Sequence, residues 1–172
     1  KALTQFMNQM GPRGVRVSVP VLLDGLQDSS WRVKSLSLQL VATLGKRQVS
    51  QLFRDLPVLV PAVMECVRDT KKQVSESARD TLDSLGGLIS NAETIKLLPW
   101  LLDALKDPEK VEPCLDELMD TTFVNSVDAQ SLAFIIPIVL RGLREGSAEV
   151  MLKACTTAGN VCSLVADVHD MR

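Results

Sequence analysis

Aromatic side chains are scarce in this chain of 172 residues: they make up 3% of it, and tyrosine is absent. The apolar fraction is nevertheless 46%, so a buried core has to consist mainly of Leu, Val, Ile, Ala and Met. In a β-sandwich, aromatic and β-branched residues usually pack the two sheets. The composition therefore favours an all-α fold, and the length is sufficient for a continuous array with a real core.

Neither sign of charge dominates, because 19 Lys and Arg stand against 21 Asp and Glu, which gives a formal net charge of −2. Such a chain has no global positive field that would draw it onto nucleic acid or anionic lipid. Binding to either therefore requires a local basic patch.

Long apolar runs are missing as well. The longest, LAFIIPIVL at 132–140, is shorter than the roughly 20 residues that span a bilayer and contains a proline. No signal peptide is visible. We therefore expect no membrane partner, and we interpret a chain that starts at Lys1 and stops in DVHDMR as a piece of a larger protein.

The spacing of ligands that is typical of structural zinc sites is absent. His169 is the single histidine, and no two cysteines form a CxxC pair. The cysteines stand in apolar helical patterns, which predicts small buried side chains in a reducing compartment. They are Cys66, Cys114, Cys155 and Cys162.

What the chain does contain is a repeat. Four similar phrases, each with a proline near its start and an acid at its end, follow one another at intervals of 38 to 41 residues. They are VPVLLDGLQD (19–28), VPAVMECVRD (60–69), LPWLLDALKD (98–107) and IPIVLRGLRE (136–145). Apolar residues in them follow the i, i+3, i+4, i+7 spacing of an amphipathic helix. Each phrase is therefore predicted to be a helix.

The prolines of the phrases follow apolar residues, which predicts that each helix extends upstream of its proline. Because proline lacks an N–H and interrupts the hydrogen bonds of a helix interior, we expect these first helices to be kinked. The four residues are Pro20, Pro61, Pro99 and Pro137.

The closing acids precede a second apolar helical pattern in every repeat. An acid at a helix start accepts from free N–H groups and suits the helix dipole, so we predict caps rather than catalysts. Asn91 and Asp128 are predicted to be further turn or cap residues, and Pro113 should shorten or bend the second helix of the third repeat. The closing acids are Asp28, Asp69, Asp107 and Glu145.

Each repeat is thus two antiparallel helices, and its length and proline placement are typical of HEAT repeats. One such pair cannot bury its apolar stripe alone, so neighbouring pairs stack into a superhelix. The predicted fold is an armadillo-like, right-handed superhelix of HEAT repeats that forms a single array over residues 1–172. Its repeats occupy residues 15–54, 55–92, 93–127 and 128–168, and residues 1–14 end a preceding repeat.

No catalytic, phosphate-binding or metal-binding motif stands out in the sequence. We therefore predict that these residues form no enzyme and take no cofactor, metal or small-molecule substrate. The acidic residues Asp116, Glu117 and Asp120 are predicted to form a solvated helix face. Trp31 and Trp100 are predicted to be partly buried, with surface anchors as the alternative.

Positive charges gather at the start of the second helix of each repeat. Stacking brings equivalent positions of neighbouring repeats roughly 10 Å apart, so these residues are expected to line one edge of the array and to contact phosphates. The alternative is ordinary solvated charge, partly paired with Asp28, Asp69 and Glu109. The candidates for contact with RNA are Arg32, Lys34, Lys71, Lys72 and Lys110. Lys153 lies one turn into the second helix of the fourth repeat.

Three segments suggest a family: SSWRVKSLSLQLVATLG, VRDTKKQVSESARDTLDSL and TTFVNSVDAQSLAFIIPIVLRGLRE. Together they resemble the HEAT-repeat region of translation elongation factor 3. They also resemble the related region of the large translational activator of the general amino-acid control pathway. The resemblance covers roughly residues 17 to 168, and DTTFV at 120–124 is its most distinctive part because the general repeat pattern does not explain it.

The resemblance implies a cytoplasmic, ribosome-associated translation factor whose HEAT region contacts ribosomal RNA and ribosomal proteins. It further implies that ATP is the cofactor of paired ATP-binding cassettes in an elongation factor 3, outside these residues. We favour elongation factor 3 on DTKKQV and RGLRE.

Two alternatives remain open. One is the activator, which binds ribosomes and helps to switch on a kinase but lacks the cassettes. The other is a general scaffold that binds other proteins through the surface of the superhelix.

Overall fold

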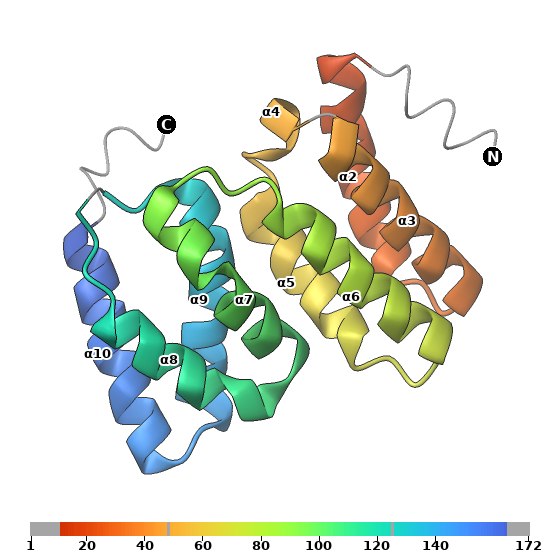
Figure 1. Cartoon of the computed structure of the whole chain (residues 1–172). Helices are drawn as coiled ribbons and strands as arrows, with labels where there is room; N and C mark the ends of the chain where they lie inside the picture. The colour runs from red at the N-terminus through yellow and green to blue at the C-terminus, as the bar shows by residue number, and fades with distance from the viewer. Residues whose placement is uncertain (1–10, 48, 125, 165–172) are drawn as a thin grey trace. The chain divides into compact units, whose positions relative to one another are not determined.

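A computed structural model describes residues 11–47, 49–124 and 126–164 (Figure 1). Every regular element in these ranges is a helix, and none of them contains a strand. This confirms the predicted all-α class. The chain divides between Leu88 and Ile89 into two compact units, each built from two antiparallel helical hairpins.

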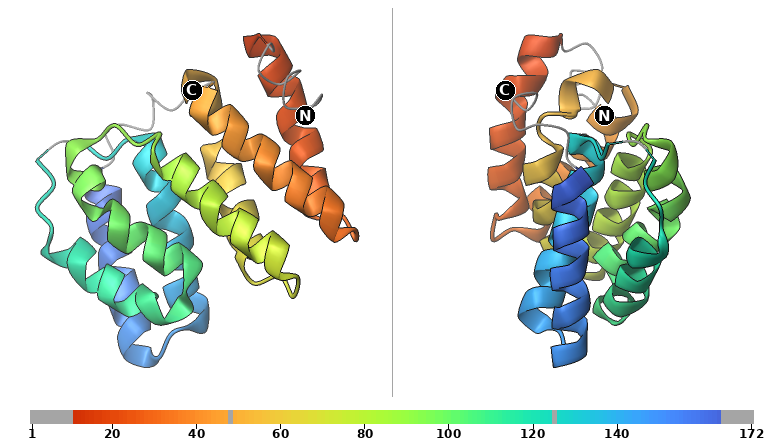
Figure 2. Two further views of the ribbon diagram at one scale, coloured as in Figure 1. Left: turned by 45° about the vertical axis from the view of Figure 1, so that its right-hand side comes forward. Right: turned by 90° about the vertical axis from the view of Figure 1, so that its left-hand side faces the viewer.

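Unit 1, residues 1–88, contains the first two hairpins. Its helices are α2 (Pro12–Leu26), α3 (Trp31–Arg47), the one-turn α4 (Val49–Leu52), α5 (Leu56–Val67) and α6 (Lys72–Gly86). α2 pairs with α3 and α5 with α6, while α3 also lies along α6 and α2 contacts α5 (Figures 1 and 2). The second helix of one hairpin therefore packs on the second helix of the next, as stacked repeats require.

Unit 2, residues 89–172, repeats this arrangement. Its helices are α7 (Ala92–Lys106), the short 3₁₀ turn η1 (Pro108–Lys110), α8 (Val111–Asp120), α9 (Ala129–Glu145) and α10 (Ala148–Leu164). α7 pairs with α8 and α9 with α10, while α8 packs on α10 and α7 on α9. Both units therefore use the same pairwise stacking.

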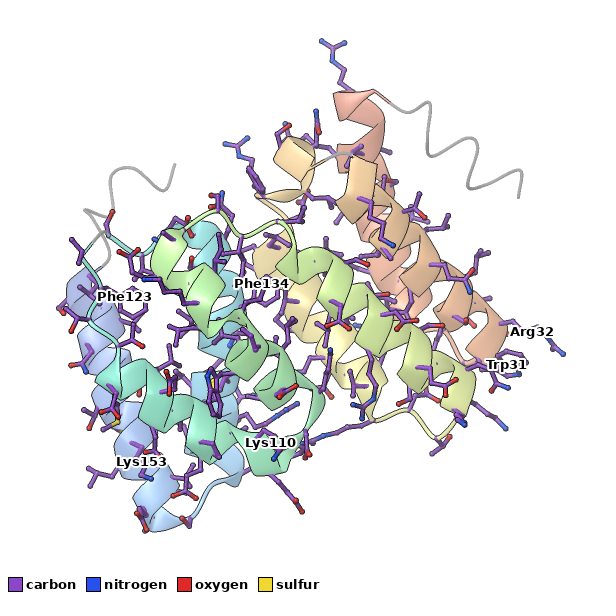
Figure 3. The ribbon with its side chains drawn as sticks, in the orientation of Figure 1. Trp31, Arg32, Lys110, Phe123, Phe134 and Lys153 are labelled. Atoms are coloured by element: carbon purple, nitrogen blue, oxygen red, sulfur yellow. The ribbon has the colours of Figure 1, made fainter. Side chains whose placement is uncertain are left out.

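Aliphatic side chains fill both cores, as the composition predicts. Leu38, Leu59 and Leu82 are among the fully buried residues of unit 1, and Leu101 and Leu115 among those of unit 2. Phe134 is the one aromatic residue among the largest fully buried side chains (Figure 3). Leucine, which loses little rotamer freedom in helices, makes up most of the largest fully buried side chains.

Each repeat proline lies inside its helix, which confirms that the helices extend upstream. Pro20 lies in α2, Pro61 in α5, Pro99 in α7 and Pro137 in α9. Each removes one N–H donor, which frees the carbonyl four residues earlier. Pro20 and Pro99 are exposed, so water can reach these positions, whereas Pro137 is buried. The expected kinks stay a prediction.

Three of the six predicted caps are confirmed. Asn91 accepts from the N–H groups of Glu93 and Thr94 at the start of α7, and Asp128 accepts from Ser131 N–H at the start of α9. Asp107 accepts from Glu109 N–H at 3.0 Å as the N-cap of η1.

The cap predicted at Glu145 is wrong. Glu145 is the last residue of α9, and the hydroxyl of Ser147 accepts from Val150 N–H at the start of α10. Only two residues, Gly146 and Ser147, connect α9 and α10, so there is room for one cap. Ser147 directly precedes α10, and its side chain therefore reaches the free N–H groups of the first turn.

The irregular third repeat behaves as Pro113 predicts. α8 has only 10 residues and begins after the 3₁₀ turn η1, whereas α3, α9 and α10 have 17 residues each. Pro113 is the third residue of α8, where the missing N–H costs little. The second helix is therefore shortened rather than broken.

The prediction of four buried cysteines is half wrong. Cys66 and Cys114 are buried, but Cys155 and Cys162 are exposed on α10. Burial raises the pKa of the Cys66 thiol and raises that of Cys114 to about 12, so both are inert thiols at neutral pH. An apolar pattern alone does not show which face of a helix another helix covers. For this reason the two cysteines of α10 were wrongly predicted to be buried.

The predicted repeat boundaries and the single array over residues 1–172 stay a prediction. Residues 1–10 of the predicted preceding repeat, residues 165–168 of the fourth repeat and His169 lie outside the described residues.

Gly142 and Gly159 form a matched pair for a test of close packing in unit 2. A Cβ at Gly142 in α9 would lie 3.1 Å from Ala154 Cβ and 3.2 Å from Leu115 Cδ1, whereas a Cβ at Gly159 in α10 would meet nothing within 4 Å. We expect Gly142→Ala to lower the free energy of unfolding by about 1–2 kcal/mol through overpacking. Gly159→Ala should raise it by about 0.5–1 kcal/mol through helix propensity.

Urea denaturation of the two variants measures both changes. Equal stabilisation by the two alanines would contradict the close approach of α8, α9 and α10 at Gly142.

Candidate nucleic-acid interface

Four of the five candidate cations lie at one end of unit 1. Arg32 and Lys34 stand in the first turn of α3, and Lys71 and Lys72 stand at the start of α6. α3 and α6 pack side by side and run in the same direction (Figure 2). We call this end, residues 27–34 and 68–72, the turn end of unit 1. Lys110 belongs to unit 2, at the end of η1.

Asp69 connects the two helix starts. Its carboxylate accepts from Lys34 Nζ at 2.8 Å and from the backbone N–H of Lys71 at 2.8 Å. The Lys34 side chain is only 25% exposed and that of Asp69 only 12%. Lys34 is therefore held in an ion pair between two hairpins, which confirms the alternative that part of this charge is paired.

The same turn occurs in the first hairpin. Asp28 Oδ1 accepts from Ser30 N–H at 2.7 Å, just as Asp69 Oδ1 accepts from Lys71 N–H. Both acids accept from the residue two positions ahead, in the turn before the helix, so the N-caps predicted at Asp28 and Asp69 are wrong. Each turn is thereby fixed by a local side-chain to backbone bond.

Three cations of the turn end are exposed. The Lys72 side chain is 85% exposed and lies 3.5 Å from Glu76 in a solvated i, i+4 pair, which has little energetic weight. Lys71 is also exposed. Arg32 is exposed too, and its guanidinium carbon lies 4.9 Å from the centre of the Trp31 ring at the start of α3 (Figure 3).

The first turn of α3 also carries Trp31, which is predicted to be partly buried, and the structure confirms that it is half-buried. Trp31 is neither fully buried nor packed among aliphatic residues alone, because Arg32 lies over its ring. The adjacent order of an aromatic and an arginine at a helix start was the available signal.

The cations of unit 2 differ from one another. Lys110 is exposed, but Lys153 Nζ lies 2.8 Å from both Glu112 and Asp116 (Figure 3). These carboxylates raise the pKa of the Lys153 ammonium. Asp116 therefore belongs to an ion-pair network between α8 and α10, which corrects its assignment to a purely solvated face.

The two units carry opposite net charge. Residues 1–88 contain 12 Lys and Arg against 8 Asp and Glu, whereas residues 89–172 contain 7 against 13. The near-neutral total conceals this division. A polyanion is attracted by unit 1 and repelled by unit 2.

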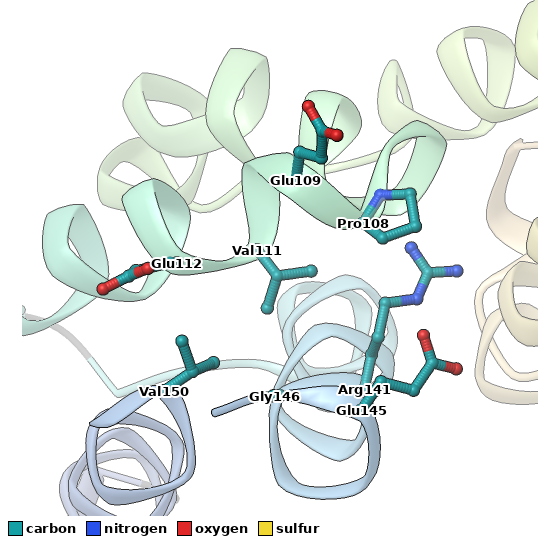
Figure 4. A pocket seen from close by; sticks show the side chains of 9 residues that line it. Pro108, Glu109, Val111, Glu112, Arg141, Glu145, Gly146 and Val150 are labelled. Carbon is teal, nitrogen blue, oxygen red and sulfur yellow. The ribbon is translucent and has the colours of Figure 1, made fainter. Parts of the chain in front are cut away.

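A cavity of about 230 Å³ in unit 2 is lined in part by Glu109, Glu112 and Glu145 (Figure 4). Arg141 reaches into it from α9 and donates to the carbonyls of Ala104 at 2.8 Å and Leu105 at 3.3 Å. These are carbonyls of the last turn of α7, so Arg141 has a structural role there.

Neither a metal site nor a membrane span is found in the part of the chain that the structure describes. No group of three or more His, Cys, Asp and Glu there has the placement to hold a metal ion. No described helix is long and apolar enough to cross a bilayer.

The Lys34–Asp69 pair predicts a defined pH dependence of stability. The Lys34 hydrogen bond and then the Lys71 N–H hold the pKa of Asp69 below its usual range. The ionised Asp69 therefore makes its full contribution to the free energy of unfolding above the ordinary Asp pKa of about 3.9. This contribution is lost as the pH falls through the lowered pKa. The same hydrogen bond raises the pKa of Lys34, so the effect is complete below about pH 10.4 and is lost as the pH rises through the raised value.

We expect Asp69→Asn to lower the free energy of unfolding by about 0.5–1 kcal/mol between pH 5 and 9. The difference from the unmodified chain should shrink towards zero at both extremes of pH, as measured by urea denaturation. Lys34→Met, which removes the partner and keeps the aliphatic stem, should show the same profile. A difference that stays constant with pH would refute the pair.

Comparison with known proteins shows which family these hairpins resemble. A model of the EF3 N-terminal HEAT repeat matches residues 1–82, and a model of the elongation factor 3/GNC1 HEAT repeat matches residues 109–172. Protein ILITYHIA of Arabidopsis thaliana is 43% identical over 99% of this chain and 7% of its own length.

Two further relatives represent the two kinds of protein in the family, GCN1 and elongation factor 3. The stalled ribosome sensor GCN1 of Homo sapiens is 37% identical over 92% of the chain and 6% of its own length. Elongation factor 3 of Phytophthora infestans is 37% identical over 87% of the chain and 14% of its own length. The chain thus spans a small fraction of each relative, and it belongs to the HEAT-repeat region that elongation factor 3 and GCN1 share.

Proposed function

We propose that this chain is a ribosome-binding scaffold of a translation factor, and that it contacts the phosphates of ribosomal RNA through the turn end of unit 1. The observation that carries the proposal is that α3 and α6 present Arg32, Lys71 and Lys72, all exposed, at one end of a positively charged unit. Two of the relatives are an elongation factor and a stalled ribosome sensor by name.

Helix geometry adds to the positive potential at this end. α3 and α6 both begin there, so the positive ends of both helix dipoles face the same side. Free N–H groups of a first helical turn donate hydrogen bonds to anions readily. Exposed Arg and Lys side chains then supply most of the affinity for phosphate, which is salt-dependent.

The ion pair between Lys34 and Asp69 gives this end its rigidity. Because Asp69 holds both Lys34 and the Lys71 backbone, the starts of α3 and α6 keep a fixed spacing. Ordering before binding lowers the entropic cost of the contact. We therefore assign Lys34 a positioning role in place of the direct contact predicted from sequence, and we retain Lys110 as a candidate contact of unit 2.

The proposal is that of a non-catalytic segment. The wider protein is expected to be cytoplasmic, and any ATP-binding cassettes would lie outside these residues. The preference for elongation factor 3 over the activator stays a prediction, because relatives of both kinds align over most of the chain. A protein-binding scaffold is the competing function, and its affinity would weaken much less with salt.

Two double variants with the same charge change test the location of the contact. Lys71→Glu with Lys72→Glu alters the turn end, and Lys46→Glu with Arg54→Glu alters exposed cations at the opposite end of unit 1. We expect the first pair to weaken co-sedimentation of the 172-residue chain with purified ribosomes by about 10-fold or more at low salt. It should also lower the slope of log affinity against log salt by about 2.

The second pair should leave a salt slope close to that of the unmodified chain. Loss confined to Lys46→Glu with Arg54→Glu would move the contact to the opposite end and overturn the assignment. Unchanged binding with both pairs, at low and moderate salt, would overturn the phosphate-binding function itself.

A further inference from the structure

We propose that Trp31 and Arg32 form a stacking platform for an unpaired base of RNA. This inference rests on the proposed function and adds to it a class of target: a nucleotide of a loop, bulge or single strand, rather than a duplex. Trp31 enters the interface as a contact residue, a role that the sequence offered only as the alternative to a partly buried position.

The platform is an aromatic ring and a guanidinium plane at a helix start. Trp31 is the first residue of α3 and is half-buried, and Arg32 lies over its ring at 4.9 Å (Figure 3). Both groups have flat π-faces on which a base can stack, and such stacking is tolerant of base identity. A cation held on the ring also lowers the cost of bringing a phosphate close.

Arg32 has no acidic partner within the described part of the chain. Its contact there is the Trp31 ring, and all its N–H groups remain available to acceptors. By contrast, Lys34 forms an ion pair with Asp69, and Lys153 of unit 2 forms one with Glu112, both at 2.8 Å. Arg32 is thus an exposed arginine that rests on an aromatic ring and remains open to a new ligand.

The neighbouring lysines suit the backbone on either side of a stacked base. Lys71 and Lys72 stand at the start of α6, which the Asp69 bridge ties to the start of α3. One helix start therefore offers a stacking surface, and the next offers charges for phosphates. Channels that bind single strands combine these two elements.

Double-stranded RNA cannot bind to both parts of this platform. Bases in A-form RNA are stacked on one another, and the deep major groove excludes side chains. A duplex would reach the lysines through its phosphates but would leave the Trp31 ring without a base. The geometry thus favours a target in which at least one base is free.

The second tryptophan is a natural control. Trp100 on α7 is 44% exposed, so both tryptophans are accessible to solvent. Yet no cation lies over the Trp100 ring within the residues described, and it belongs to the acidic unit 2. Trp100 therefore has the exposure but neither the guanidinium nor the charge that the platform requires.

The experiment uses two single-tryptophan variants of the 172-residue chain. Trp100→Phe leaves Trp31 as the only indole, and Trp31→Phe leaves Trp100. Each is titrated with a uridine single strand and with a blunt RNA duplex of equal phosphate number, while fluorescence and anisotropy are recorded. We expect saturable quenching of Trp31 by the single strand, much weaker quenching by the duplex, and none for Trp100.

A third variant measures the contribution of stacking to affinity. Trp31→Ala should weaken binding of the uridine strand by about tenfold, in line with the loss of one stacked base, and change duplex binding by less than about twofold. Trp31→Phe, which retains a ring, should bind the strand more tightly than Trp31→Ala. Circular dichroism spectra that match the unmodified chain verify that α3 is intact.

The outcomes separate this inference from the proposed function. Salt-dependent binding of the uridine strand without quenching of Trp31, or equal loss of strand and duplex binding in Trp31→Ala, would overturn the platform and leave phosphate binding in place. Ribosome binding that falls in Trp31→Ala while the strand neither binds nor quenches would assign Trp31 to a protein partner and overturn the platform. Failure of the proposed function is read separately, from unchanged ribosome binding in Lys71→Glu with Lys72→Glu.

Discussion

Burial of one helical hairpin against the next is the constraint on which the rest of each unit depends. A single pair of amphipathic helices leaves an apolar stripe in water, and only a second pair removes it. In unit 1, α3 lies on α6, and in unit 2, α8 lies on α10. The polar features follow from this stacking, because it brings the starts of second helices together and so lets Lys34 reach Asp69 and Lys153 reach Glu112.

Much of the fold could be predicted because its signals are local and repeated. A proline such as Pro61 and an acid such as Asp69 recur at fixed intervals, and both report on the chemistry of helix interiors and helix starts. Asn91 and Asp128 were recognisable as caps for the same reason. Glu145 was not, since the choice between it and Ser147 depends on how tightly the chain turns between α9 and α10.

The candidate interface was less predictable, because it depends on pairings between residues far apart in the sequence. The sequence placed Lys34 and Lys71 near the starts of two successive second helices, but it did not show that one is bound by Asp69 and the other exposed. It likewise did not distinguish the buried Cys114 from the exposed Cys155, which both stand in apolar patterns. The net charge of the whole chain concealed the opposite charges of the two units.

Asp69 has a consequence for the cooperativity of the repeats. In a nearest-neighbour description of a repeat protein, each hairpin has an intrinsic stability and each junction has an interfacial one. The bond from Lys71 N–H to Asp69 belongs to the first quantity, and the bond from Lys34 belongs to the second. One carboxylate thus enters both quantities, so the residue that orders the turn of the second hairpin of unit 1 is also the residue that binds the first hairpin.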